Sequence, residues 1–153
     1  MDVYLNTTWR AMINIDLMAS LKKTTIGAQN WYAASTCPTA ERYIWAPALN
    51  EVSAWESSSA SYQSEGSRFA YFTANSSASA LFAYSDDGSA KAEWWTRSPV
   101  FGTQTAKAID ESDTGDPILN REATRSLGYR PVFCLSSDLP AAPLSAGVYD
   151  LVL

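Results

Sequence analysis

The chain has 153 residues, of which 46% are hydrophobic and 12% aromatic, which is enough apolar mass for one core and too much for a disordered tail. Sixteen acidic side chains outnumber eleven basic ones and give a net charge of -5, which disfavours nucleic acid and anionic lipid surfaces as partners. No segment approaches the roughly 20 apolar residues of a membrane span, so we expect no membrane insertion.

The histidine and cysteine counts limit the chemistry further. The chain contains no histidine, which excludes Ser-His-Asp triads, Cys-His dyads and histidine-based zinc sites. Its two cysteines, Cys37 and Cys134, are too far apart in sequence for a CxxC clip. They form one disulfide or remain two thiols, and we favour free, buried thiols. We predict no cofactor and no metal.

Two helices are expected in the first third of the chain. Apolar side chains recur at four-residue steps over Thr7–Lys23, which is typical of an amphipathic helix. Asn6 or Thr7 is expected to cap its start. A second, shorter helix is predicted over Ala48–Trp55, entered through Pro47.

The rest of the sequence predicts short strands separated by long loops. The Ser-rich segment Ser57–Ser67 predicts a loop laid over the core. The Asp-Gly pattern within Ser85–Ser89 predicts a turn that joins two antiparallel strands. The acidic run Asp110–Ser126 lacks the spacing of a calcium loop and predicts a solvated loop. The expected strands are Arg42–Ala46, Arg68–Thr73, Ala80–Tyr84, Glu93–Arg97, Thr105–Ile109, Tyr129–Leu135 and Val148–Leu153.

The densest cluster of aromatic and charged side chains is Trp-Trp-Thr-Arg-Ser-Pro at Trp94–Pro99, the Trp-Trp motif. Adjacent tryptophans on a strand point to opposite faces, so one of Trp94 and Trp95 anchors the core while the other covers a loop or lines a surface site. Arg97 shares the face of Trp95, where it stacks on an indole or pairs with a carboxylate. For Arg97 we favour the structural role over ligand contact.

A second cluster, Gly128–Pro131 with the sequence Gly-Tyr-Arg-Pro, is the Arg-Pro motif. Arg130 stands there between aromatic and apolar neighbours. A buried charge without a partner costs several kcal/mol, so a carboxylate is expected nearby. Glu51, in the predicted second helix, is our candidate partner for Arg97 or Arg130 in an ion pair that holds the fold.

The order of these two motifs resembles a family of domains of unknown function in bacteriophage tail or other structural proteins and in bacterial surface proteins. The hallmark of that family is Trp-Trp-Leu-Arg-Ser-Pro followed, after a variable loop, by Gly-Val-Arg-Pro. Thr96 replaces its leucine and Tyr129 its valine. The likeness extends upstream to Tyr4–Asn6 and Ile44–Val52, and downstream to Ala146–Leu151, so it covers nearly the whole chain.

The resemblance implies an α+β fold related to C-type lectins and to the formylglycine-generating enzyme. One or two early helices would pack on short, twisted antiparallel strands with long loops, in a single domain over residues 1–153. Family members usually carry further strands before the first helix, so we expect a fragment or one domain of a larger protein. The implied location is a virion, as a tail or other structural component, or a bacterial cell surface.

The favoured function is non-catalytic recognition or assembly, with a host-surface protein or glycan, or neighbouring virion subunits, as the partner. Tyrosine, tryptophan and serine in loops suit such binding. A purely structural virion subunit, including a homo-oligomer, is the alternative. Less favoured is an enzyme, either a formylglycine-generating relative, which would need two closely placed cysteines for copper, or a hydrolase with paired carboxylates. The loop residues expected to contact a ligand are Tyr62, Phe101, Gln104, Asp113, Asp116 and Asn120.

Overall fold

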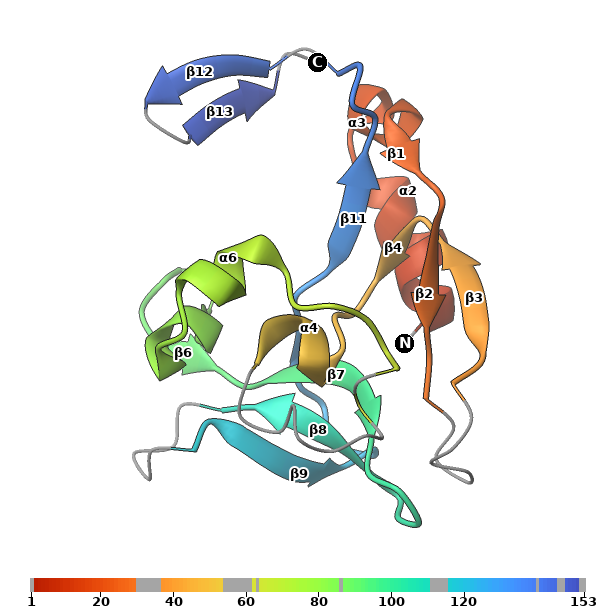
Figure 1. The fold of residues 1–153 in the computed structure, drawn as a ribbon, viewed down its shortest axis with the longest axis vertical. Helices are drawn as coiled ribbons and strands as arrows, with labels where there is room; N and C mark the ends of the chain where they lie inside the picture. Colours follow the sequence, from red (N-terminus) through yellow and green to blue (C-terminus); the bar gives the residue numbers. More distant parts are fainter. Residues whose placement is uncertain are drawn as a thin grey trace. The chain divides into compact units, whose positions relative to one another are not determined.

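Short helices and small, mainly antiparallel sheets alternate along the chain in a computed structural model of the protein (Figure 1). This confirms the predicted α+β class, while the C-type-lectin-like architecture stays a prediction. None of the described helices is long and apolar enough to cross a membrane. The structure describes residues 2–29, 37–53, 62, 64–85, 87–110, 116–139, 141–145 and 148–151.

The chain divides into two compact units. The first unit comprises Met1–Thr24, Glu41–Trp45 and Val132–Leu153, and the second comprises Thr25–Ala40 and Ala46–Pro131. Strands β2 (Thr24–Gly27) and β3 (Thr39–Arg42) form a two-stranded sheet.

The predicted helix over Thr7–Lys23 is wrong in its bounds and its continuity. Helical structure begins earlier and stops at Ile13, whose backbone is extended. Asn14 then starts a new helix, because its side-chain oxygen accepts a hydrogen bond from Asp16 N at 2.8 Å. The segments are α1 (Asp2–Tyr4), a π-helix η1 (Leu5–Trp9), α2 (Arg10–Met12) and α3 (Ile15–Ala19).

Asn6 joins the helical segment to a strand of the first unit instead of capping a helix. Its Nδ2 donates to Ile44 O at 2.7 Å, and its Oδ1 accepts from the backbone N–H of Ile44 at 3.3 Å. Arg10 stacks on Tyr43, with 3.9 Å between the guanidinium carbon and the ring centre. These contacts hold the helical segment against the chain that leads into the sheet.

The first unit contains a three-stranded antiparallel sheet and a terminal hairpin. The sheet has the order β1 (Leu21–Lys22), β11 (Val132–Leu135), β4 (Ile44–Trp45). The hairpin pairs β12 (Ala141–Ser145) with β13 (Val148–Leu151). The strand predicted over Val148–Leu153 is therefore confirmed as far as Leu151, and its last two residues lie outside the described part.

Cys37 and Cys134 are free thiols, as predicted. Cys37 is half-buried and its Sγ lies 3.2 Å from Ser64 O. The predicted burial is wrong for Cys134, which lies opposite Lys22 on β11 and points to the exposed face of the sheet.

A four-stranded sheet forms the base of the second unit (Figure 1). Its order is β10 (Gly128–Tyr129), β7 (Trp94–Pro99), β8 (Thr105–Ile109), β9 (Ile118–Glu122), with β8 antiparallel to both neighbours and β10 parallel to β7. The strands predicted over Glu93–Arg97 and Thr105–Ile109 are confirmed. The predicted strand over Tyr129–Leu135 is interrupted at Arg130 and Pro131, because proline supplies no N–H for the ladder.

Three short helices and one hairpin cover this sheet. The predicted second helix is present as α4 (Leu49–Val52), and the turn over Ser85–Ser89 joins β5 (Ala83–Tyr84) to the antiparallel β6 (Lys91–Ala92) as predicted. The strand predicted over Arg68–Thr73 is wrong, because α6 (Ala70–Ala74) occupies this segment. A 3-10 helix, η2 (Ala78–Leu81), replaces the start of the strand predicted over Ala80–Tyr84.

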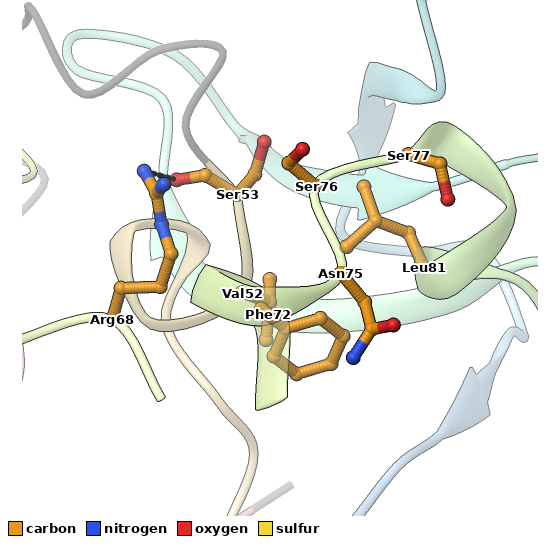
Figure 2. Close-up of a pocket in the computed structure, with 8 residues that line it drawn as sticks. All are labelled: Val52, Ser53, Arg68, Phe72, Asn75, Ser76, Ser77 and Leu81. Atoms are coloured by element: carbon orange, nitrogen blue, oxygen red, sulfur yellow. Dashed lines mark hydrogen bonds between the residues drawn. The ribbon is translucent and has the colours of Figure 1, made fainter. Parts of the chain in front are cut away.

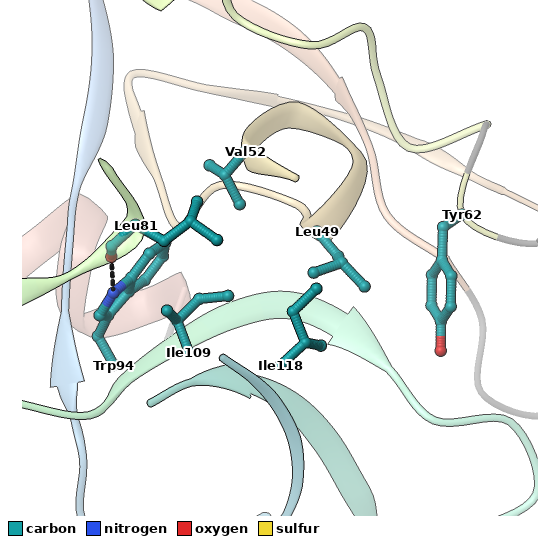
Figure 3. Packing of buried hydrophobic residues seen from close by; sticks show 7 residues of the cluster. All are labelled: Leu49, Val52, Tyr62, Leu81, Trp94, Ile109 and Ile118. Atoms are coloured by element: carbon teal, nitrogen blue, oxygen red, sulfur yellow. Dashed lines mark hydrogen bonds between the residues drawn. The ribbon is translucent and has the colours of Figure 1, made fainter. Parts of the chain in front are cut away.

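The core of the second unit lies between α4 and the four-stranded sheet (Figure 3). Phe69, Phe72 and Ala83 pack against it from the edge. Aromatic residues are frequent in strands because of how they pack on a sheet, not because of a backbone preference. The rings of Phe72 on α6 and of Phe69 just before it pack on the same core from a helix. The buried members are Leu49, Val52, Tyr62, Leu81, Trp94, Ile109 and Ile118.

Substitution of Ile118 tests strand β9, which the sequence did not predict. Ile118 is buried in the core, so Ile118→Ala is expected to lower the free energy of unfolding by about 2 to 5 kcal/mol. The next residue, Leu119, points to the other face of the strand and is half-buried, so Leu119→Ala is the matched control with a smaller loss. Urea unfolding measures both, and equal losses would contradict this alternation.

Candidate functional site

The centre of the second unit is the guanidinium of Arg97, which β7 carries into the interior beside α4. Its Nη1 and Nη2 donate to the two carboxylate oxygens of Glu51, at 2.6 and 2.8 Å. Nε donates to Gly27 O at 2.7 Å, Nη1 also donates to Ala46 O at 3.0 Å, and Nη2 also donates to Glu65 O. All five N–H groups of the guanidinium therefore have acceptors. The ion pair that the sequence predicts for Glu51 is formed with Arg97.

Glu51 belongs to both the ion pair and the start of α4. Its Oε2 also accepts from Ala48 N at 2.9 Å, which satisfies one of the N–H groups that a helix leaves free at its first turn. Ser98 Oγ accepts from the next backbone donor, Leu49 N, at 2.8 Å. The Trp-Trp motif thus supplies both the cation that pairs with α4 and a hydroxyl that caps it.

Glu65 is a second buried carboxylate beside the first and is only 1% exposed. Its Oε2 accepts a short hydrogen bond from Ser98 Oγ, while Arg97 bonds to the backbone oxygen of Glu65 and not to its carboxylate. Burial raises the pKa of Glu65 above its ordinary value of 4.5, although the Ser98 hydroxyl and the charge of Arg97 oppose that rise.

Two glycines allow the chain to approach this centre closely. A Cβ on Gly66 would lie 2.5 Å from Glu51 Oε1, and the φ of Gly66 is 151°, which favours glycine. A Cβ on Gly27 would lie 2.7 Å from Ser64 O. Glu65, Gly66 and Gly27 were not predicted as site residues. The sequence signal for Glu65 and Gly66 is an isolated Glu-Gly pair in a Ser-rich segment, and Gly27 lies outside that segment.

Arg130 occupies a separate aromatic environment in the second unit. Its guanidinium carbon lies 5.2 Å from the ring centre of Trp94 and 6.0 Å from that of Phe72. Leu81 O accepts from both Arg130 Nη1, at 3.2 Å, and Trp94 Nε1, at 2.9 Å. Burial lowers the pKa of Arg130. In the described part of the chain its partners are rings and a carbonyl, so the alternative pairing with Glu51 is not formed.

A third charged cluster lies at the surface of the four-stranded sheet. Arg121, on β9, pairs with Glu93 at 2.8 Å and with Asp110 at 2.9 Å. The Arg121 guanidinium lowers the pKa of Glu93. Its side chains are about one fifth exposed, so removal of one charge from this cluster should cost less free energy of unfolding than removal of one charge from the buried pair.

The structure places the predicted binding residues in different parts of the second unit. Tyr62 is 8% exposed and its hydroxyl lies 3.4 Å from Pro99 O, so its ring packs in the core and offers little surface to a ligand. Phe101 and Gln104 are exposed together in the turn between β7 and β8. Asn120 is exposed in the middle of β9, and Asp116 caps the start of that strand by accepting from Ile118 N at 2.9 Å.

Neither Trp95 nor Asp113 is placed by the structure at an exposed binding surface. Trp95 is buried like Trp94, which removes it as the lining of a surface site. Asp113 lies outside the described residues. Among the residues that are described, no three Asp, Glu, Cys or His side chains gather where they could hold a metal ion.

The Trp-Trp and Arg-Pro motifs thus build a small α+β unit around a buried Arg-Glu pair. The chain belongs to the DUF6273 family, described as a domain of unknown function, whose model matches residues 1–137 and so includes both motifs. No curated protein matches the chain, and no solved structure matches it.

Removal of the Arg97 guanidinium is expected to unfold the second unit readily. Arg97→Gln leaves Glu51 buried without its cation and should lower the free energy of unfolding by about 3 to 5 kcal/mol, as measured by urea unfolding. Arg121→Gln removes two more exposed pairs, with Glu93 and Asp110, and should cost less, about 1 kcal/mol. Similar losses in the two variants would show that the buried pair does not hold the unit together.

Neutralisation of Glu65 is expected to change the pH dependence of stability. Because its pKa is raised on folding, the free energy of unfolding is highest below the ordinary value of 4.5 and falls as the pH rises through the raised pKa. Glu65→Gln should remove this fall and be more stable than the wild type at neutral pH. The control is Glu122→Gln, at an exposed carboxylate of β9, whose pH profile should follow the wild type. If the free energy of unfolding of Glu65→Gln changed with pH in parallel with the wild type, the raised pKa of Glu65 would be contradicted.

Proposed function

We propose that this chain is a non-catalytic recognition or assembly domain of a bacteriophage structural protein, such as a tail or receptor-binding protein, or of a bacterial surface protein. Its architecture in this proposal is C-type-lectin-like, and it acts on the virion or at the bacterial surface. The observation that supports this best is the contrast between the buried polar groups around Arg97, which bond to one another, and an exposed aromatic turn at the end of the four-stranded sheet.

The interior polar groups are engaged in holding the chain. Every N–H of the Arg97 guanidinium has a protein acceptor, and both oxygens of Glu51 accept from Arg97. Ser98 bridges Glu65 and the start of α4. Catalysis needs a group that meets substrate in the transition state, and these groups are buried and already paired.

The turn between β7 and β8 presents its side chains from a fixed backbone. Val100 N donates to Thr105 O at 3.0 Å, and Thr103 Oγ1 donates to Val100 O at 3.0 Å. Gly102 has a φ of 71°, which suits glycine in a tight turn. Phe101 is 55% exposed on this turn. A rigid aromatic side chain loses little conformational entropy on binding, so the turn suits a protein or glycan partner.

The turn also lies beside the end of β9, which widens the available surface. Ala123 N donates to Gln104 O at 3.0 Å, so the residues that follow β9 contact the turn. Asp116 stands at the opposite end of the same strand and lies outside this surface. The proposed contact residues are therefore Phe101 and Gln104.

Binding of the fluorescently labelled chain to a panel of bacterial cells and a glycan array tests the proposal. The double variant Phe101→Ala, Gln104→Ala should lose at least about tenfold in affinity for whichever target the wild type binds. Tyr84→Ala is the matched control, because Tyr84 is 60% exposed on another hairpin of the same unit, and it should bind as the wild type does. Equal binding by the double variant would refute a role for this turn.

Light scattering of the purified chain, with and without EDTA, separates recognition from the alternative of a purely structural virion subunit. A monomer that binds a surface target supports recognition. A stable oligomer that is indifferent to EDTA and binds no target would support the structural subunit. A change of mass with EDTA would contradict the expected absence of metal.

A further inference from the structure

Strand β9 is one outer edge of the four-stranded sheet, because no described strand pairs with it on the side away from β8 (Figure 1). It pairs with β8 over all five of its residues, Ile118–Glu122, without a shift in register. A regular strand at an edge presents backbone N–H and C=O groups to a strand of another chain. A pocket beside the end of α4 (Figure 2) has room for about one water molecule, so it offers a macromolecule no comparable surface.

The hydrogen bonds at the two ends of the β8–β9 ladder show which backbone groups of β9 point outward. Ala123 N donates to Gln104 O at 3.0 Å. At the other end Asp110 N donates to Pro117 O at 2.8 Å. Hydrogen-bonded and non-hydrogen-bonded pairs alternate in an antiparallel ladder, so every second residue of β9 bonds to β8 and the others direct their backbone groups away from it. The outward-directed residues are Ile118, Asn120 and Glu122.

Local hydrogen bonds already occupy the outward groups at the two ends of this edge. Asp116 Oδ1 accepts from Ile118 N at 2.9 Å. Glu122 O accepts from Arg125 N at 3.0 Å. In the described part of the chain, two acceptors and two donors remain without a partner along the edge. They are Ile118 O, Asn120 O, Asn120 N and Glu122 N.

We propose that β9 pairs with β9 of a second copy of this chain, antiparallel and about a two-fold axis at Asn120. Asn120 N of each copy donates to Asn120 O of the other. Glu122 N of each copy donates to Ile118 O of the other. This symmetric contact uses every free group of the edge once and leaves both local hydrogen bonds intact.

The side chains of β9 favour this register over the two neighbouring ones. Glu122 lies opposite Ile118 of the second copy, and Arg121 lies opposite Leu119, so no like charges face each other. An axis at Glu122 would set two carboxylates opposite each other. An axis at Ile118 would require the N–H group that Asp116 already holds. Charge and hydrogen bonding therefore select the same register.

The contact involves one short strand from each copy, which is less than the interface of a stable dimer needs. We expect a weak dimer that dissociates on dilution, unlike the stable oligomer of a purely structural subunit. Copies held side by side would pair more readily, because their effective concentration is higher. The contact includes neither Phe101 nor Gln104, so its test is independent of the recognition test above.

Sedimentation equilibrium at concentrations up to about 1 mM, with NMR of a mixture of isotope-labelled and unlabelled chain, tests the pairing. The register brings Hα of Leu119 close to Hα of Arg121 of the second copy, so an intermolecular NOE is expected between them. The amides of Asn120 and Glu122 should exchange with deuterium more slowly as the concentration rises. A chain that stays monomeric would overturn the pairing, and a dimer without this NOE would overturn the register.

Charge reversal at the proposed axis gives a second test, because Asn120 is exposed and each variant should fold. Asn120→Lys alone and Asn120→Asp alone each place like charges opposite each other, and the dimer affinity should fall at least about tenfold. An equal mixture of the two variants should associate again, because lysine then faces aspartate. Asn120→Thr keeps the backbone groups and adds no charge, so it should dimerise as the wild type does. Wild-type affinity in Asn120→Lys alone would overturn the proposal.

Discussion

The second unit depends on the buried ion pair between Arg97 and Glu51. Both side chains are less than one tenth exposed, and a charge left alone in such a place destabilises a fold by several kcal/mol. The same guanidinium also bonds to the backbone of Gly27, Ala46 and Glu65. Segments that are far apart in the sequence therefore meet at this guanidinium. All of them must be in place before every N–H group of Arg97 has an acceptor.

This arrangement explains why the outer surfaces are the better candidates for binding. The Arg97 guanidinium does not bond the buried carboxylate of Glu65 directly, and Ser98 compensates by donating a hydrogen bond to this carboxylate. The polar groups around Arg97 therefore bond to one another. By contrast, Phe101 and Gln104 are exposed on the turn between β7 and β8.

Predictions that depend on a local sequence pattern are confirmed, whereas predictions of segments whose structure depends on packing are wrong. The strand Thr105–Ile109 and the Asp-Gly turn follow from neighbouring residues, and both are confirmed. The segment Arg68–Thr73 has an aromatic pattern typical of a strand, yet it is mostly helical because its rings pack on the core from α6. Strand β9 was missed because three of its five residues, Asn120, Arg121 and Glu122, are polar and it follows directly on an acidic run, so its sequence shows no strand pattern.

By itself the sequence determined the α+β class, the strand of the Trp-Trp motif, the absence of histidine chemistry and Glu51 as the partner of either Arg97 or Arg130. Only the tertiary structure decided that Glu51 pairs with Arg97 while Arg130 stacks on aromatic rings, and that Glu65 and Tyr62 are buried. The physical reason is the range of the interactions. Strand and turn preferences act between neighbours, whereas Glu51 and Arg97 are 46 positions apart and Glu65 and Ser98 are 33 apart, so their meeting depends on how the whole unit packs.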